Sequence, residues 1–182
     1  MKKYLEWAGR EPSTRRVVVT LALAGGVVLA GVPLLVAVSA DWLDRWLGLA
    51  RFTAGFATRV VGTVLMVAGG LFGFWAVLAE ARIGHGTPVP MVPTRRLVVV
   101  PPFTYCRNPM VLGTGVCYLG FSLWLGSVSA IVLVVVFAAL LLVYAKVLEE
   151  KELEARFGAD YLEYKRTTPF LVPGLTRRHR SS

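Results

Sequence analysis

The chain has 182 residues, of which 55% are hydrophobic, with a mean hydropathy of +0.62. This composition excludes an ordinary soluble domain and indicates a small integral membrane protein. The net charge of +9 does not indicate a nucleic-acid partner, because the basic residues flank apolar segments and do not alternate with aromatic residues. Cys106 and Cys117 lack the spacing of metal ligands, so we expect reduced thiols and no metal site.

A basic, polar segment, residues 1–16, precedes the first apolar segment, which runs from Val17 to Ala40. At 24 residues it is too long for the apolar part of a signal peptide, so we predict an uncleaved first transmembrane span. Residues 41–50 place Trp42 and Trp46 on one helical face, with Asp44 elsewhere on the helix. This pattern predicts a short separate helix that lies in the membrane interface.

A second span is predicted from about Val60 to Ala79. Four glycines would give this span a face of small residues for packing against a neighbouring helix: Gly62, Gly69, Gly70 and Gly73. Residues 84–107 contain five prolines, so they cannot form one continuous helix. The apolar run Leu97–Val100 inside this loop predicts an ordered segment that packs against the membrane domain.

Asn108 and Pro109 have the residue types of a helix cap and a first helical residue, so a helix is predicted to begin there. Apolar segments then run from Met110 to Gly126 and from Ile131 to Leu148, with only four uncharged residues between them. This spacing predicts a tight antiparallel helical hairpin, and leaves open whether the hairpin fully crosses the membrane.

Helical periodicity continues beyond the last apolar segment and is predicted to stop at Gly158. The following tail contains Tyr161 and Tyr164, which we expect to pack back on the domain. The predicted fold is therefore all-α: an integral membrane bundle of about four transmembrane helices, with a tight C-terminal hairpin and a cytoplasmic helical tail.

The basic residues predict how the chain is oriented in the membrane. Of the 20 Lys and Arg residues, 17 lie in residues 1–16, 82–107 and 146–182. Cytoplasmic segments near membrane spans carry an excess of Lys and Arg, so we expect both termini and the proline-rich loop in the cytoplasm. The predicted location is the bacterial inner membrane, with the polar motifs of the chain on one cytoplasmic face.

Three motifs on that face are candidates for a site, and each allows two interpretations. The glycines of Gly84-His85-Gly86 allow close backbone approach to a ligand, or form an ordinary turn. Arg107 can bind a carboxylate or phosphate, or can extend to lipid phosphates at the membrane surface. Glu149 and Glu150 can bind a cation or hydroxyl groups, or can form a solvated surface in which Lys146 pairs with Glu150.

The order of the motifs resembles a known superfamily. A Gly-x-Gly turn, a proline-rich loop, YxRNPM from Tyr105 to Met110, an apolar hairpin, Glu-Glu and FGxxYxxY follow one another over residues 60–175. This order is similar to that of the isoprenylcysteine carboxyl methyltransferase and phospholipid methyltransferase superfamily of membrane enzymes. The chain has Pro101-Pro102-Phe103 where many members have Gly-Pro-Tyr, which leaves the substrate class open.

The resemblance implies a methyltransferase that binds S-adenosyl-L-methionine at the cytoplasmic face. It divides the chain into residues 1–59 (cytoplasmic arm, first span and interfacial helix), 60–175 (catalytic core) and 176–182 (basic tail). Candidate catalytic residues are Arg107, Glu150 and His85, with His85 or a glutamate as a candidate general base. Candidate cofactor-binding residues are Gly84, His85, Gly86, Pro88, Tyr105, Arg107, Asn108, Pro109, Glu149 and Glu150. We expect Arg107 and Glu150 to bind charged groups of the cofactor and to contribute little to stability.

The sequence does not identify the methyl acceptor, and it leaves two alternative functions open. The expected partners are membrane lipids and a lipophilic or small-molecule acceptor: a prenyl-cysteine carboxylate, phosphatidylethanolamine, a small thiol or a quinone-like lipid. One alternative is an NADPH-dependent membrane lipid reductase, for which Arg95 and Arg96 are the candidate 2′-phosphate ligands. The other is a non-enzymatic membrane scaffold. Binding of S-adenosylhomocysteine, of NADPH or of neither would discriminate among the three.

Overall fold

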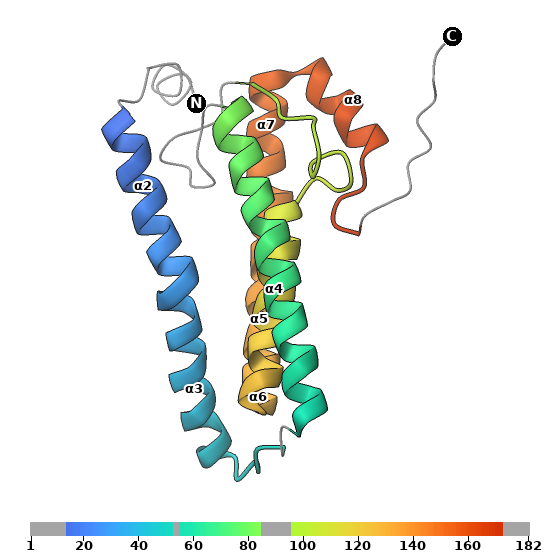
Figure 1. Cartoon of the computed structure of the whole chain (residues 1–182). Helices are drawn as coiled ribbons and strands as arrows, with labels where there is room; N and C mark the ends of the chain where they lie inside the picture. Colours follow the sequence, from blue (N-terminus) through green and yellow to red (C-terminus); the bar gives the residue numbers. More distant parts are fainter. Residues whose placement is uncertain (1–13, 53–54, 85–95, 173–182) are drawn as a thin grey trace.

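The computed structural model describes residues 14–52, 55–84 and 96–172, and these ranges contain helices and no strand (Figure 1). The first long helix comprises α2 (Thr14–Gly26), the π-helical turn η1 (Val27–Gly31) and α3 (Val32–Trp46). The second comprises α4 (Phe56–Ala79) and the π-helical turn η2 (Glu80–Gly84). The remaining elements are α5 (Pro109–Leu125), α6 (Val128–Tyr144), the π-helical turn η3 (Ala145–Glu149), α7 (Glu150–Phe157) and α8 (Ala159–Thr167).

Three of these helices are long and apolar enough to cross a membrane. They extend over Val18–Trp46, Phe56–Gly84 and Val128–Phe157, and a shorter apolar helix, Pro109–Leu125, packs among them. Their lipid-facing side chains are apolar and exposed, as a bilayer requires of a spanning helix. The prediction of an all-α membrane bundle is confirmed.

The first helix differs from the prediction at its end. Residues 41–46 do not form a separate interfacial helix, because neither proline nor glycine interrupts the backbone hydrogen bonds between Ala40 and Trp46. The helix instead continues to Trp46 and ends before Gly48, whose φ of +64° is left-handed. Trp42 and Trp46 stack on its exposed side with ring centroids 6.1 Å apart, which suits a position at the membrane surface.

The closest helix contact in the bundle joins α4 to α5 through glycines on both helices. A Cβ atom built on Gly69 would lie 2.5 Å from the backbone nitrogen of Cys117. A Cβ atom built on Gly113 would lie 2.5 Å from the backbone nitrogen of Gly73. In lipid, such close packing supplies the van der Waals contact that holds helices together. The predicted glycine face is confirmed at Gly62, Gly69 and Gly73, and Gly113 and Gly120 of α5 form its other half. Gly70 lies off this face, because a Cβ atom built there meets only the sulfur of Cys117.

The turn that connects α5 to α6 is shorter than predicted. α5 ends at Leu125, the φ of +65° at the following Gly126 permits the reversal of the chain, and α6 begins at Val128. The hydroxyl of Ser127 accepts a hydrogen bond of 3.0 Å from the backbone N–H of Ala130 and so caps α6. The turn therefore needs only Gly126 and Ser127.

Asp44 attaches the first helix to this turn. Its carboxylate is buried, and accepts hydrogen bonds from the Ser127 hydroxyl at 2.6 Å and from the Ser129 backbone N–H at 3.3 Å. A carboxylate at the start of a helix also interacts favourably with the helix dipole. The sequence placed Asp44 away from the apolar face of an interfacial helix, but the continuation of α3 brings it into the bundle.

We therefore expect Asp44→Ala to lower the free energy of unfolding by about 1–3 kcal/mol, because buried donors of the turn lose a charged acceptor. Thermal unfolding in detergent measures the change. Asp41→Ala is the matched control: Asp41 is more exposed and forms a surface ion pair with Arg51, which is worth under about 1 kcal/mol. Equal effects of the two substitutions would contradict the capping role.

Candidate active site

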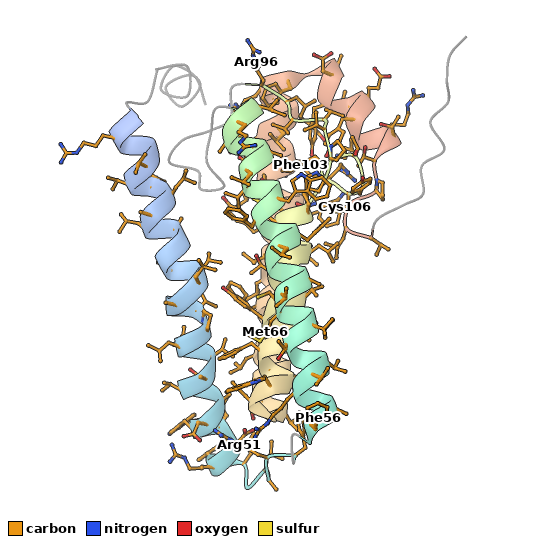
Figure 2. The ribbon with its side chains drawn as sticks, viewed as in Figure 1. Arg51, Phe56, Met66, Arg96, Phe103 and Cys106 are labelled. Atoms are coloured by element: carbon orange, nitrogen blue, oxygen red, sulfur yellow. The ribbon has the colours of Figure 1, made fainter. Side chains whose placement is uncertain are left out.

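The polar motifs meet at one end of the bundle, where α7 and α8 lie close to the C-terminal end of α4 (Figure 1). Figure 2 shows Phe103 and Cys106 in the segment that lies between these elements. A cavity of about 80 Å³ opens here. Its lining consists of Glu80, Leu97, Val98, Phe103, Arg107, Asn108, Ala145, Glu149, Glu150, Leu153, Tyr161 and Tyr164.

Two π-helical turns supply carboxylates to this cavity. Glu80 is the first residue of η2, and Glu149 is the last residue of η3. A π-helical turn inserts one extra residue into a helix and rotates the side chains that follow it, and such turns are frequent at functional sites. Helical periodicity read from the sequence assumes no such insertion, so it does not place these two side chains together.

Glu150 is the centre of a buried ion-pair network. Its Oε1 atom contacts Nη1 of Arg107, and only 9% of the Arg107 side chain and 5% of the Glu150 side chain are exposed. Oε2 of Glu150 lies 3.0 Å from Nζ of Lys146 and 3.2 Å from Nζ of Lys165. The carboxylates of Glu154 and Glu150 raise the pKa of Lys165, which keeps it protonated. Three cations therefore contact one buried carboxylate, and Lys165 is shared with the carboxylate of Glu154.

Arg107 also holds the segment after α8. Its backbone N–H donates to the carbonyl of Pro169 at 2.9 Å, and its Nε donates to the carbonyl of Thr168 at 3.0 Å. Its guanidinium carbon lies 5.5 Å from the centre of the Phe170 ring, within the range of a cation–π contact. We call residues 168–170 the C-terminal strap.

Asn108 binds the same strap. As predicted, α5 begins at Pro109 with Asn108 in the capping position. The Asn108 side chain nevertheless makes no capping hydrogen bond: its Nδ2 donates to the carbonyl of Phe170 at 2.9 Å. The Arg-Asn-Pro motif thus both begins α5 and fastens the C-terminal strap to the site.

The two tyrosines of α8 close one side of the cavity. Tyr161 and Tyr164 are buried, and their ring centroids lie 6.0 Å apart. The hydroxyl of Tyr164 donates to the carbonyl of Phe103 at 2.7 Å, and burial raises the pKa of this tyrosine. The tail therefore packs back on the domain as predicted, and its aromatic rings form part of the cavity wall.

Arg107, Asn108, Glu149 and Glu150 are the predicted cofactor-binding residues that line the cavity. Gly84 and Pro109 are buried nearby but are not part of its lining. Tyr105 is 42% exposed and contacts the edge of the Trp75 ring, at 6.2 Å between centroids, outside the lining. His85, Gly86 and Pro88 lie outside the described residues.

The structure adds lining residues that the motifs did not indicate. Leu97 and Val98 belong to the apolar run that was predicted to be ordered, and Val98 is buried. Glu80 directly follows the predicted second span, and a single acid after an apolar segment usually marks a membrane boundary. No sequence signal distinguishes such a boundary residue from a side chain that faces a site.

The family model for phospholipid methyltransferases matches residues 57–160, which is more than half of the chain. No curated protein and no solved structure gave a match. The matched region contains α4, the Arg-Asn-Pro motif, the α5–α6 hairpin, η3 and α7, and therefore most of the residues that line the cavity. The chain belongs to the phospholipid methyltransferase family of membrane methyltransferases.

Proposed function

We propose that this membrane methyltransferase uses S-adenosyl-L-methionine as its methyl donor and methylates a lipophilic or small-molecule acceptor at a carboxylate, amine or thiol. The observation that carries the proposal is the cavity in which the Arg-Asn-Pro and Glu-Glu motifs converge. We further propose residues 60–175 as the catalytic core, in the bacterial inner membrane with both termini cytoplasmic.

The donor supplies a methyl group on a sulfonium centre, which the acceptor's lone pair displaces in line to leave S-adenosylhomocysteine. The protein then has to orient the two molecules and exclude water. Glu149 is the motif carboxylate that is suited to an ammonium group or ribose hydroxyls, because Glu150 already contacts Arg107, Lys146 and Lys165. Arg107 acts in the site chiefly by keeping Glu150 and the C-terminal strap in place.

Ligand size adds one requirement to the proposal. The cavity of about 80 Å³ is smaller than the ~300–1,000 Å³ typical of small-molecule pockets. A nucleoside-containing donor therefore fits only when side chains of the lining move apart. The C-terminal strap is not part of the lining, but it is bound to the lining residues Arg107 and Asn108 by hydrogen bonds and by the Phe170 ring, so its displacement would free these two side chains.

The test is ligand binding by calorimetry to the purified protein in lipid nanodiscs. We expect S-adenosylhomocysteine to bind and NADPH not to bind. Glu149→Gln should weaken S-adenosylhomocysteine binding by about tenfold, since a hydrogen bond to a charged group contributes about 1.5–3 kcal/mol. Glu163→Gln, an exposed change on α8, is the control and should leave the affinity unchanged.

Other outcomes would contradict the proposal. Binding of NADPH without S-adenosylhomocysteine would favour the lipid reductase, and binding of neither would favour the scaffold. If Glu149→Gln binds S-adenosylhomocysteine as tightly as the wild type does, Glu149 is not part of the donor site, although the choice of donor still stands.

A further inference from the structure

The charges around the cavity are unevenly compensated. Three carboxylates line it, those of Glu80, Glu149 and Glu150, and Arg107 is the only cationic residue of the lining. Arg107 contacts Glu150, as do Lys146 and Lys165 from outside the lining. Within the described part of the chain, the side chains of Glu80 and Glu149 have neither an ion pair nor a hydrogen bond. Two of the three carboxyl groups thus line the cavity without a partner.

The fold holds these two charges near each other despite their repulsion. Burial and the nearby charge of Glu149 both disfavour the ionised form of Glu80. Glu80 is half-buried and Glu149 is exposed, so a ligand can reach both carboxylates from the surface. Apolar side chains of Leu97, Val98 and Leu153 surround them and offer no hydrogen bonds in place of water. Local conflicts of this kind in a natural protein are expected at functional sites.

A cation with several hydrogen-bond donors suits these two carboxyl groups. An ammonium group carries one positive charge and three N–H donors, which matches two carboxylates on opposing helical turns. A Ca²⁺ ion takes six to eight oxygen ligands. Across the described ranges, no cluster of three or more His, Cys, Asp or Glu residues is suited to a metal.

We propose that Glu80 and Glu149 together form a subsite for an ammonium group, and that its occupant is the amino group of the methyl donor. This inference rests on the proposed function. It assigns a donor-binding role to Glu80, which lies outside the Gly-x-Gly, Arg-Asn-Pro and Glu-Glu motifs. It also explains why Arg107, Lys146 and Lys165 contact Glu150 and leave Glu80 and Glu149 open: a cation on Glu80 or Glu149 would compete with the donor.

The experiment compares two ligands on the full-length protein in nanodiscs. S-adenosylhomocysteine carries the amino-acid part with its ammonium group, whereas 5′-methylthioadenosine has the same nucleoside and a thioether but no amino-acid part. Glu80→Gln keeps the size of the side chain and removes its charge. We expect it to weaken S-adenosylhomocysteine binding about tenfold and to leave 5′-methylthioadenosine binding unchanged.

Thermal stability distinguishes a residue that binds the ligand from one that only supports the fold, because replacing a supporting residue lowers the unfolding temperature. Because Glu80→Gln removes a repulsion, its unfolding temperature should equal or exceed that of the wild type while its affinity for S-adenosylhomocysteine falls. Glu163→Gln should change neither quantity. An equal loss of both ligands, no loss of either, or a lowered unfolding temperature of Glu80→Gln would overturn the subsite alone. Failure of the wild type to bind S-adenosylhomocysteine would overturn the proposed function and the subsite with it.

Discussion

Replacing Gly69 by alanine should lower the free energy of unfolding by about 2–3 kcal/mol, at the upper end of the cost of overpacking a core. The added methyl group would lie 2.5 Å from the backbone nitrogen of Cys117 and 2.6 Å from the carbonyl oxygen of Gly113. Both atoms belong to the backbone of α5, so no side chain can rotate away. Relief of the clash requires the two helices to separate, which loses contact along the whole glycine face.

Gly70→Ala is the matched control for this prediction. Gly70 is the next residue of the same helix, but a Cβ atom there meets only Sγ of Cys117, at 3.9 Å. The two substitutions change helix propensity equally and lie in the same part of the membrane, so the difference in stability between the two variants isolates the effect of α4–α5 packing. Thermal unfolding in detergent measures both. Equal stability of the two variants would mean that α4 and α5 do not pack through Gly69.

Arg107→Ala should cost about 3 kcal/mol of stability, since removal of one partner from a buried ion pair typically costs about 3–5 kcal/mol. We expect the lower end of this range because Lys146 and Lys165 still contact Glu150. The same change removes the hydrogen bond to Thr168 and the contact with Phe170, so limited proteolysis should cleave the C-terminal strap faster. The buried contacts of Arg107 thus favour a role in stability, in contrast to the expectation from the sequence that Arg107 contributes little to stability.

Two further variants make this prediction specific. Lys146→Ala should cost under about 1 kcal/mol, because the Lys146 side chain is 52% exposed. Glu150→Gln removes the charge that Arg107 compensates, so Arg107→Ala should cost less in that background than in the wild type. Additive losses in the double variant, or an Arg107→Ala protein as stable as the wild type, would contradict the ion-pair network. Binding data for Arg107 variants can be interpreted only beside these stability measurements.

Parts of the site followed from the sequence because they depend on neighbouring residues. Asn108 and Pro109 begin α5, and Gly158 ends α7 with a φ of +54°, since proline and glycine restrict or extend the backbone locally. The Lys146–Glu150 pair followed from helical spacing. Convergence of the Arg107 and Glu150 motifs at one end of the bundle followed from the number of spans between them.

The remaining features depend on how helices face one another. Arg107 could have bound lipid, a ligand or the protein, and only the packing of α8 on α7 presents it with Glu150 and the strap carbonyls. Asp44 reaches the α5–α6 turn because α3 continues without a break past Ala40.

The sequence by itself determined the membrane-spanning helices, because the thickness of the hydrocarbon layer requires about 20 apolar residues in each span. It also determined the glycine face of α4, because only small residues allow two helix backbones to touch. The tertiary structure alone decided that Glu80 and Glu149 line the same cavity. The reason is geometric: Glu80 and Glu149 come from helices far apart in the sequence, and η3 shifts the helical register before it reaches Glu149. Whether the two side chains meet therefore depends on how the helices pack and not on the periodicity of either helix.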